Sequence, residues 1–262
     1  MYNHFSQLAS RYRDLRTTDA EPIAFIGETL KYLPEVKAAD VGCGDGRYDL
    51  LLFQHLNNLH LSCIDTNIPM LEHVSDYLTK HNITRFETIQ AVAEDFPLKN
   101  NSMDCVLTFN AIHHFDFLKF IEKAAEMIKA EGKIFIYTRL RSQNARNIWG
   151  QYFPSFLEKE TRLYELNEME RWIQSVESLA IETVKQFKYE RTSTLERLIE
   201  QAKGKHYSTF SLYKEEELDE AIQAFQDNIK KAFQKTDKIE WFDENILLVL
   251  KLGRQQKDVA HH

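Results

Sequence analysis

The hydrophobic and polar positions of this chain follow helical spacing at first and then change to short apolar runs separated by amphipathic segments. Residues 1–33 carry apolar residues at helical spacing, and Pro34 ends that segment. Between residues 36 and 139, apolar runs of strand length alternate with segments of helical periodicity. Strands that alternate with helices of this length predict an α/β fold with a parallel, doubly wound sheet.

The same pattern places the individual elements of this half. Strands are expected at residues 36–42, 59–65, 86–95, 103–114 and 133–139. Helices are expected at residues 46–58, 68–82 and 117–132, and Gly132 is expected to end the third of them. The run at 103–114 is apolar on both faces, which is typical of a parallel strand that is covered on both sides.

The second half of the chain has a different pattern. Residues 140–180 predict irregular, helix-rich structure, residues 180–191 a strand, and residues 193–236 an all-helical insertion. The second helix of the insertion carries one apolar stripe, made of Leu218, Ile222, Phe225, Ile229 and Phe233. Residues 238–252 predict a hairpin, with its turn at Asp243 to Asn245 and a long final strand from Ile246 to Leu252.

Composition and charge narrow the function classes. The chain has 262 residues, and its 33 basic and 40 acidic residues give a net charge of -7. An acidic balance provides no electrostatic footprint for nucleic acid or for an anionic membrane. No apolar run approaches the roughly 20 residues that a transmembrane helix needs, and the polar N-terminus does not have the pattern of a signal peptide. We therefore expect a cytoplasmic protein.

The cysteines indicate neither a metal site nor a nucleophile. Cys43, Cys63 and Cys105 are far apart and form no CxxC pair. Each lies in or beside an apolar run that is expected to be a strand, so they are expected to be reduced and largely buried.

The stretch "AADVGCGDGRYDL" at residues 38–50 suggests a turn that binds a nucleotide-like ligand. A P-loop would need a Lys followed by Ser or Thr, and neither follows Gly46. The dinucleotide fingerprint is GxGxxG, whereas Gly42, Gly44 and Gly46 give GxGxG. The glycines allow a sharp turn close to a ligand, but the loop alone does not choose the ligand.

The segments after the next strands make the ligand more specific. Asp65 ends the second expected strand, where its carboxylate can accept hydrogen bonds from both hydroxyls of a ribose and would repel a ribose phosphate. "AEDFP" follows the third strand, where Asp95 and Phe96 can bound an adenine. The fourth strand ends at Asn110, followed by "AIHHF".

At this point the chain resembles a known family. "DVGCGDG", "IDTNIPML", "AEDFPLKNNSMDCVLTFNAIHHF" and "GKIFIYT" are similar to the successive motifs of class I S-adenosylmethionine-dependent methyltransferases of the small-molecule "type 11" kind. The resemblance covers roughly residues 1–140 and the closing hairpin. It implies a Rossmann-like, doubly wound, seven-stranded sheet whose last strand is antiparallel.

The resemblance also implies an organisation of the chain into segments. Residues 1–34 would be an N-terminal helical lid, and residues 35–140 the core that binds S-adenosylmethionine. Residues 141–192 would hold substrate loops, helices and the sixth strand, residues 193–237 the helical insertion, and residues 238–262 the closing hairpin and tail.

Cofactor contacts carry over from the family position by position. The resemblance places Asp40, Gly42, Cys43 and Gly44 at the methionine end, and Asp65 at the ribose. Thr66 and Met70 would flank the adenine, with Glu94, Asp95 and Phe96 at its edge. Asn110 and Ala111 would lie under the sulfonium, and Tyr12 and Arg16 would belong to the lid. Several of these, Asp40, Met70, Glu94, Tyr12 and Arg16 among them, are also compatible with purely structural roles.

The methyl acceptor is constrained mainly by motifs that are missing. The chain has no (N/D)PP(Y/F) tetrapeptide after the fourth strand, so methylation of adenine or of glutamine amides is not expected. It also has no Pro-Cys there, so methylation of base carbons is not expected. His113 is the candidate catalytic residue, with a structural role as the alternative. Arg139, Trp149, Tyr152 and Tyr207 are the candidates for a small anionic or aromatic acceptor, although the aromatic residues can equally form a core of the insertion. A noncatalytic S-adenosylmethionine-binding partner protein and an NAD-dependent oxidoreductase are the alternative functions.

Overall fold

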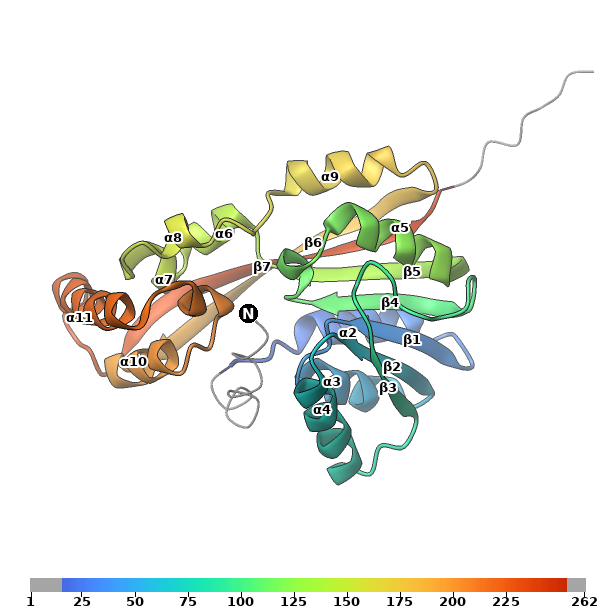
Figure 1. Ribbon diagram of the computed structural model, residues 1–262, viewed down its shortest axis with the longest axis horizontal. Helices are drawn as coiled ribbons and strands as arrows, with labels where there is room; N and C mark the ends of the chain where they lie inside the picture. Colours follow the sequence, from blue (N-terminus) through green and yellow to red (C-terminus); the bar gives the residue numbers. More distant parts are fainter. Residues whose placement is uncertain (1–15, 254–262) are drawn as a thin grey trace, which may run out of the picture.

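The computed structural model describes residues 16–253, which contain a single seven-stranded sheet (Figure 1). Tyr12 and the C-terminal histidines lie outside the described residues. The strand order is β3-β2-β1-β4-β5-β7-β6, and β7 runs antiparallel to both of its neighbours. The strands are β1 (Val36–Val41), β2 (Leu59–Asp65), β3 (Phe86–Gln90), β4 (Met103–Phe109), β5 (Ile128–Thr138), β6 (Leu179–Ser193) and β7 (Ile239–Leu252). The predicted α/β class, the doubly wound sheet and the antiparallel last strand are confirmed.

Helices cover both faces of this sheet (Figure 1). Apolar residues of α2 (Glu21–Leu30), α3 (Arg47–His55) and α4 (Ile68–Lys80) pack on one face. Those of α5 (Phe117–Met127) and α9 (Leu166–Ser175) pack on the other. Alternation along the strands separates the two cores, because successive strand side chains point to opposite faces. In β5, for example, Phe135 and Tyr137 belong to the first core, and Ile134 and Ile136 belong to the second.

The third helix of the α/β region ends earlier than the sequence pattern predicts. α5 ends at Met127, and β5 already begins at Ile128, so the expectation that Gly132 ends the helix is wrong. Ile128 is fully buried and pairs with Met103 of β4, which extends the sheet at this point. The register shifts before Lys133 pairs with Cys105, so the residues between form an irregularity in the strand.

The predicted closing hairpin is also wrong in its turn. β7 is continuous through residues 243–245, and its antiparallel partner is β6 along its whole length. Asp243 pairs with Tyr189 and Asn245 pairs with Phe187. The polar triplet resembles a turn in the sequence, but Asp243 and Asn245 line a cavity and Glu244 pairs with Arg146, so these polar side chains are accommodated in a continuous strand.

The helical insertion has a core of its own at the far end of the β6–β7 ribbon (Figure 1). Around this core lie α7 (Ile148–Tyr152), α8 (Phe156–Lys159), α10 (Leu195–Lys203) and α11 (Glu215–Ala232), with α6 (Arg141–Arg146) next to α7 and β7. In the predicted stripe Leu218, Ile222, Phe225 and Ile229 are buried, and Phe233 is half-buried just after the helix.

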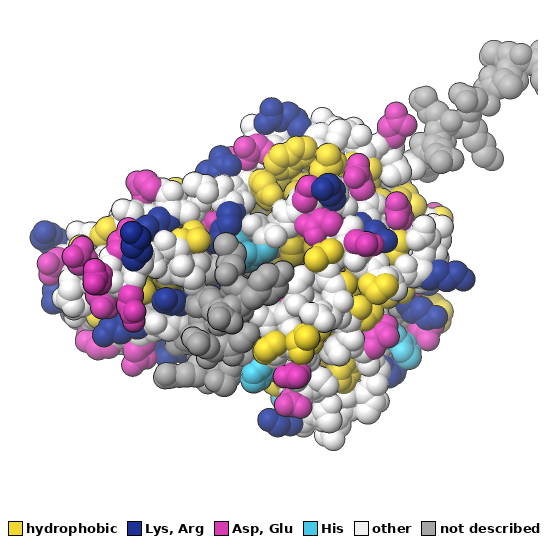
Figure 2. Space-filling view, viewed as in Figure 1, with side chains coloured by type: hydrophobic (Ala, Val, Ile, Leu, Met, Phe, Trp, Pro, Cys, Tyr) yellow, Lys and Arg dark blue, Asp and Glu magenta, His cyan; other side chains and the backbone are white. Residues whose placement is uncertain are grey.

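Basic and acidic side chains are interspersed on the face in Figure 2. Between residues 16 and 253, no helix is both long and apolar enough to cross a bilayer.

Candidate functional site

The glycine loop lies between β1 and α3 and adopts a backbone that only glycine takes easily. Gly42, Gly44 and Gly46 have φ angles of 76°, 57° and 73°, in the left-handed region that is costly for other residues. At Gly42, a Cβ atom would also lie 2.7 Å from the Cβ of Ala111. At Gly44, a Cβ would meet nothing within 4 Å. The backbone of this loop therefore faces open space at Gly44.

That space is a first cavity of about 280 Å³ at the carboxyl edge of the parallel strands. The ends of β1, β2 and β4 and the start of α4 form its wall, which is where doubly wound sheets bind ligands. It gathers most of the predicted cofactor residues, namely Arg16, Gly42, Cys43, Gly44, Asp65, Thr66, Met70, Asn110 and Ala111. Ala91 and Ala93, which follow β3, also line it and were not predicted. Their small side chains in "QAVAED" were the only sequence feature that could have indicated this role.

Asp65 joins the end of β2 to the glycine loop. Its Oδ2 accepts a hydrogen bond from the backbone N–H of Gly44 at 3.0 Å, and its Oδ1 accepts one from that of Asn67 at 2.9 Å. Burial raises the pKa of Asp65, while these two N–H groups act in the opposite direction. The carboxylate therefore shapes the loop and still has lone pairs that can accept hydrogen bonds from a ligand.

Beneath the loop lies a pair of buried carboxyl groups. Asp40, at the end of β1, and Asp49, in the first turn of α3, are buried and interact with each other. Burial raises the pKa of Asp49 to about 6, and burial together with the Asp49 charge raises that of Asp40 well above its usual range. The two groups thus favour a shared proton. Asp40 does not line the cavity, and its predicted cofactor contact stays a prediction.

The structure places Glu94, Asp95 and Phe96, the last predicted adenine contacts, outside the lining of the first cavity. The side chain of Asp95 is 86% exposed, and its Oδ1 lies 3.6 Å from Nζ of Lys123. Glu94 accepts a hydrogen bond from the backbone N–H of Asp116, and Phe96 is fully buried in the core. Glu94, Asp95 and Phe96 are not among the lining residues, and their predicted contacts with adenine stay predictions.

A second cavity, of about 300 Å³, adjoins the first and lies over the β6–β7 ribbon. The two cavities share the lining residues Arg16, Arg47, Tyr48, Asn110 and His113. Of the four acceptor candidates, Arg139, Trp149 and Tyr207 line the second cavity. Tyr152 does not, because its ring packs 5.5 Å from that of Phe233 in the insertion.

Asn110 and His113 lie where the two cavities meet. Asn110 has a φ of 54°, and its Oδ1 accepts a hydrogen bond at 3.1 Å from Nδ2 of Asn245 on β7. Nε2 of His113 lies 3.4 Å from Oγ of Ser208 in the insertion. Burial, and then the neighbouring His114, lower the pKa of His113 well below its usual value. Burial therefore keeps His113 a neutral imidazole and makes it a weak proton acceptor.

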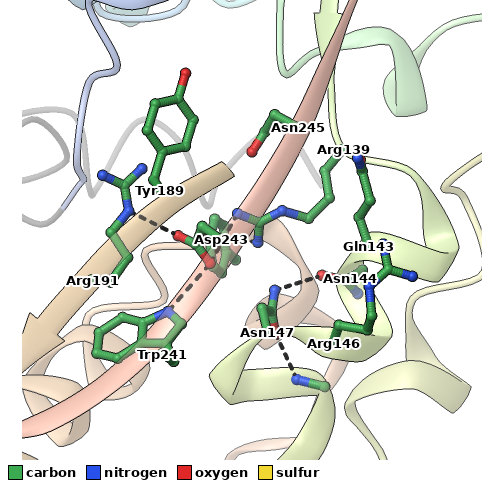
Figure 3. Close-up of polar contacts among 12 residues, drawn as sticks. Arg139, Gln143, Asn144, Arg146, Asn147, Tyr189, Arg191, Trp241, Asp243 and Asn245 are labelled. Carbon is green, nitrogen blue, oxygen red and sulfur yellow. Dashed lines mark hydrogen bonds and ion pairs between the residues drawn. The ribbon is translucent and has the colours of Figure 1, made fainter. Parts of the chain in front are cut away.

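The floor of the second cavity carries an ion-pair network that the sequence did not reveal (Figure 3). Asp243 forms an ion pair with Nη2 of Arg139 at 3.3 Å. It also accepts hydrogen bonds from Nε of Arg191 at 3.3 Å and from the Trp241 indole N–H at 3.3 Å. Arg191 also pairs with Asp19, which precedes α2. Burial works against the charge of Arg139, but Asp243 raises its pKa, so it stays a cation. Trp241, Asp243 and Asn245 stand at every second position, so the sequence pattern could have indicated that they share one face of a strand.

Metal-ligand geometry is absent from the described part of the chain. Between residues 16 and 253, no group of three or more His, Cys, Asp or Glu side chains could hold a metal ion. The three cysteines are free thiols; Cys63 and Cys105 are buried and Cys43 is partly buried.

Comparison with known proteins connects this site to a family. Residues 38–132 match the family described as "Methyltransferase domain". The uncharacterized methyltransferase YcgJ of Bacillus subtilis (strain 168) is 26% identical over 136 residues, which are 50% of this chain and 52% of that protein. The aligned part therefore spans about half the length of that relative.

Solved structures share the fold over most of the chain. The structure of YcgJ from Bacillus subtilis matches with a TM-score of 0.62 at 16% identity, covering 90% of this chain and 100% of that one. Geranyl diphosphate C-methyltransferase from Streptomyces coelicolor A3(2), in complex with geranyl diphosphate and S-adenosyl-L-homocysteine, matches with a TM-score of 0.53 at 12% identity, covering 87% and 78%. The [4+2]-cyclase SpnF matches with a TM-score of 0.58 at 12% identity, covering 88% and 80%.

These structural matches establish the fold, and the sequence match assigns the core of the chain. The matched segment, residues 38–132, includes the glycine loop, Asp65, Asn110 and His113, which are the residues that build the first cavity and its border with the second. Residues 38–132 of this chain therefore match a methyltransferase domain in sequence, and the chain shares its fold with a solved methyltransferase.

Proposed function

We propose that the protein is an S-adenosylmethionine-dependent methyltransferase that acts on a small molecule. The observation that carries this proposal is the meeting of two cavities at Asn110 and His113, one built on the glycine loop and the other on β7. Methyl transfer needs such an arrangement, because a donor and an acceptor must be held in line and close together.

The residues present fit the cofactor. The open side of Gly44 leaves room for a methionine moiety against the loop backbone, and Asp65 has acceptor capacity for ribose hydroxyls. Met70, Thr66, Ala91 and Ala93 offer a mostly apolar wall for an adenine. S-adenosylmethionine supplies an activated methyl group when it is bound.

The remaining work falls to the chain itself. Asn110, fixed by Asn245, borders the space where the methyl group would lie, and the insertion covers that space through Ser208 and Tyr207. His113 borders both cavities and is the candidate to take a proton from an acceptor that loses one, but burial makes its imidazole a weak base.

The acceptor is proposed to be a small anionic or aromatic molecule. Arginines and aromatic side chains both line the second cavity, which is enclosed between the sheet and the insertion. Geranyl diphosphate C-methyltransferase, which shares the fold, was solved with a small anionic acceptor, which supports the same class for this chain.

Calorimetric binding of S-adenosylhomocysteine tests the proposal. We expect the wild-type protein to bind it, and Asp65→Ala to bind it roughly tenfold to hundredfold more weakly, because hydrogen bonds to a charged group are lost. Asp76→Ala is the matched control, since Asp76 is an exposed carboxylate on α4. A wild-type protein that binds NAD and not S-adenosylhomocysteine would contradict the proposal.

Turnover separates the enzyme from a noncatalytic binding protein. We expect S-adenosylhomocysteine to be released when the protein and S-adenosylmethionine are incubated with a panel of small carboxylic acids, phosphate esters and phenols. Cofactor binding with no release over that panel would favour the noncatalytic alternative.

A further inference from the structure

We propose that the second cavity binds the methyl acceptor through an oxyanion group, a carboxylate or a phosphate, held by Arg139 and Arg191. This inference rests on the proposed methyltransferase function and adds the chemical class of the acceptor and the place of its charged group. It follows from the charges of the cavity wall, from the donors that these two arginines leave unused, and from the direction of β7.

The charges of the wall favour an anion over a cation. Five arginines line the second cavity, against three carboxylates, and its two histidines, His113 and His206, both have a pKa well below the usual value because they are buried. Each of the three carboxylates already has an arginine partner. The pairs are Asp19 with Arg191, Asp243 with Arg191 and Arg139, and Glu160 with Arg162. A cationic acceptor would thus find every carboxylate occupied.

Arg139 and Arg191 keep donors that the ion-pair network does not use. Each guanidinium carries about five N–H groups in a planar fork. Arg139 uses Nη2 for Asp243 and Nη1 for Tyr207, and Nε has no partner among the described residues. Arg191 uses Nε for Asp243 and Nη2 for Asp19, which leaves Nη1. A planar fork suits an oxyanion that accepts two hydrogen bonds.

Asp243 is the positioning residue of this anion site (Figure 3). It holds both guanidinium groups from one side, at 3.3 Å from Nη2 of Arg139 and 3.3 Å from Nε of Arg191. Because its carboxylate is buried between them, the two arginines can remain charged and close together. Without it, like-charge repulsion would separate them.

The direction of β7 sets the distance between the anion and the reacting atom. Asp243 and Asn245 share one face of β7 and are about 7 Å apart along an antiparallel strand. Asn245 in turn donates to Asn110 at the junction of the two cavities. An acceptor whose anionic group lies on the order of 7 Å from the methylated atom would span this interval.

Two aromatic residues of the wall, Trp149 and Tyr207, are already engaged in ring contacts. Trp149 stacks on Phe225 at 5.1 Å and contacts Phe210 edge-on at 5.1 Å in the core of the insertion. The ring of Tyr207 has the guanidinium groups of Arg16 and Arg139 at 5.3 and 5.5 Å from its centroid. These rings offer an acceptor little free face for stacking, so charge is the stronger basis for recognition.

Anion binding to the cofactor-loaded protein tests the inference. The protein is saturated with S-adenosylhomocysteine, and its thermal unfolding is followed with increasing inorganic phosphate or acetate, with chloride at matched ionic strength as the reference. We expect phosphate or acetate to raise the unfolding temperature of the wild type beyond chloride. The anion that does so distinguishes a phosphate ester from a carboxylic acid as the natural acceptor.

Variants assign the effect to the site. Arg191→Gln should lower the affinity for the stabilising anion roughly tenfold to hundredfold, because charge-assisted hydrogen bonds are lost. Arg146→Gln is the control, since Arg146 is exposed, pairs with Glu244 and does not line the cavity. If Arg191→Gln does not fold, Arg191→Lys keeps the positive charge without the fork and should bind the anion more weakly than the wild type.

Failure of the anion site and failure of the proposed function can be distinguished. If S-adenosylhomocysteine binds and neither anion stabilises the wild type beyond chloride, the anion site is wrong and the methyltransferase proposal stands. Undiminished anion binding in a folded Arg191 variant would also overturn the anion site. If S-adenosylhomocysteine does not bind at all, the proposed function itself fails.

Discussion

At the scale of the residue, the site depends on a few backbone and side-chain positions with unusual environments. The left-handed glycines of the loop could be predicted, because their spacing is visible in the sequence. The pairing of Asp40 with Asp49 could not be predicted, because it depends on how β1 and α3 approach each other in three dimensions. The same holds for Asp95, whose side chain points to Lys123 and not into the first cavity.

The buried pair predicts an unusual pH dependence of stability. The pKa of Asp49 is about 6 in the folded protein, above its ordinary value of 3.8, so the folded state binds more protons between these two pH values. Stability should therefore fall as the pH rises through this window, and the full penalty should be present above about pH 6. We expect Asp49→Asn to unfold at a higher temperature than the wild type at pH 7, and this gain to disappear near pH 4.

Thermal unfolding between pH 4 and pH 8 measures this difference. Asp76→Asn, on the exposed face of α4, should follow the wild-type curve. A lower unfolding temperature for Asp49→Asn at pH 7 would show that the carboxylate stabilises the loop in its charged form.

At the scale of the element, the β6–β7 ribbon organises the part of the chain that the family motifs do not cover. The two strands pair from Leu179 with Leu252 to Ser193 with Ile239, and the helical insertion connects the end of β6 to the start of β7. One face of the ribbon enters the second cavity through Trp241, Asp243 and Asn245. A local reading of "WFDENILL" favours a turn, because Asp and Asn are common there. The long-range pairing with β6 overrides that preference.

The insertion should be stabilised mainly by its own aromatic core. Phe225 is fully buried and lies 5.1 Å from Trp149 and 5.3 Å from Phe153, measured between ring centroids. We expect Phe225→Ala to lower the free energy of unfolding by about 3–5 kcal/mol, because a large cavity remains. Binding of S-adenosylhomocysteine to the folded fraction should change little, since Phe225 does not line the first cavity.

Chemical denaturation, with calorimetry on the folded protein, checks this expectation. Phe242→Ala is the matched control, because Phe242 is 45% exposed on β7; its cost should stay below about 1 kcal/mol. Equal losses of unfolding free energy in the two variants would mean that the buried Phe225 contributes no more to stability than the exposed Phe242.

At the scale of the whole molecule, the two cavities are joined through the N-terminal segment. Arg16 lines both of them, donates to the backbone carbonyl of His206 at 2.5 Å and lies over the ring of Tyr207. It thus connects the cofactor side of the sheet to the insertion. Its predicted role in a lid over the cofactor remains a prediction, and the contact with the insertion extends it.

Arg16→Gln should weaken the binding of ligands in both cavities. We expect roughly tenfold or greater losses in the affinity for S-adenosylhomocysteine and for the anion that binds the second cavity, because one charge faces both. Calorimetry with each ligand, and with Arg197→Gln as a variant that lines only the second cavity, measures the two effects separately. A loss confined to one ligand would show that Arg16 serves one cavity.

The sequence by itself determined the order of strands and helices, the glycine loop and the residues at the strand ends. Those features follow from local periodicity and from motifs whose residues are close in the chain, such as Asp65, Asn110 and the three glycines. They were enough for the doubly wound sheet and most of the first cavity, whereas the antiparallel last strand was expected only from the family resemblance.

Only the tertiary structure decided the second cavity. Asp19, Arg139, Arg191 and Asp243 are spread over more than two hundred residues of the chain and become neighbours only because β7 lies between β5 and β6. No local pattern encodes such a network, since an ion pair depends on distance in space. The physical reason is that the parallel sheet and the first cavity are built from local units, whereas the second cavity is built from contacts between distant segments.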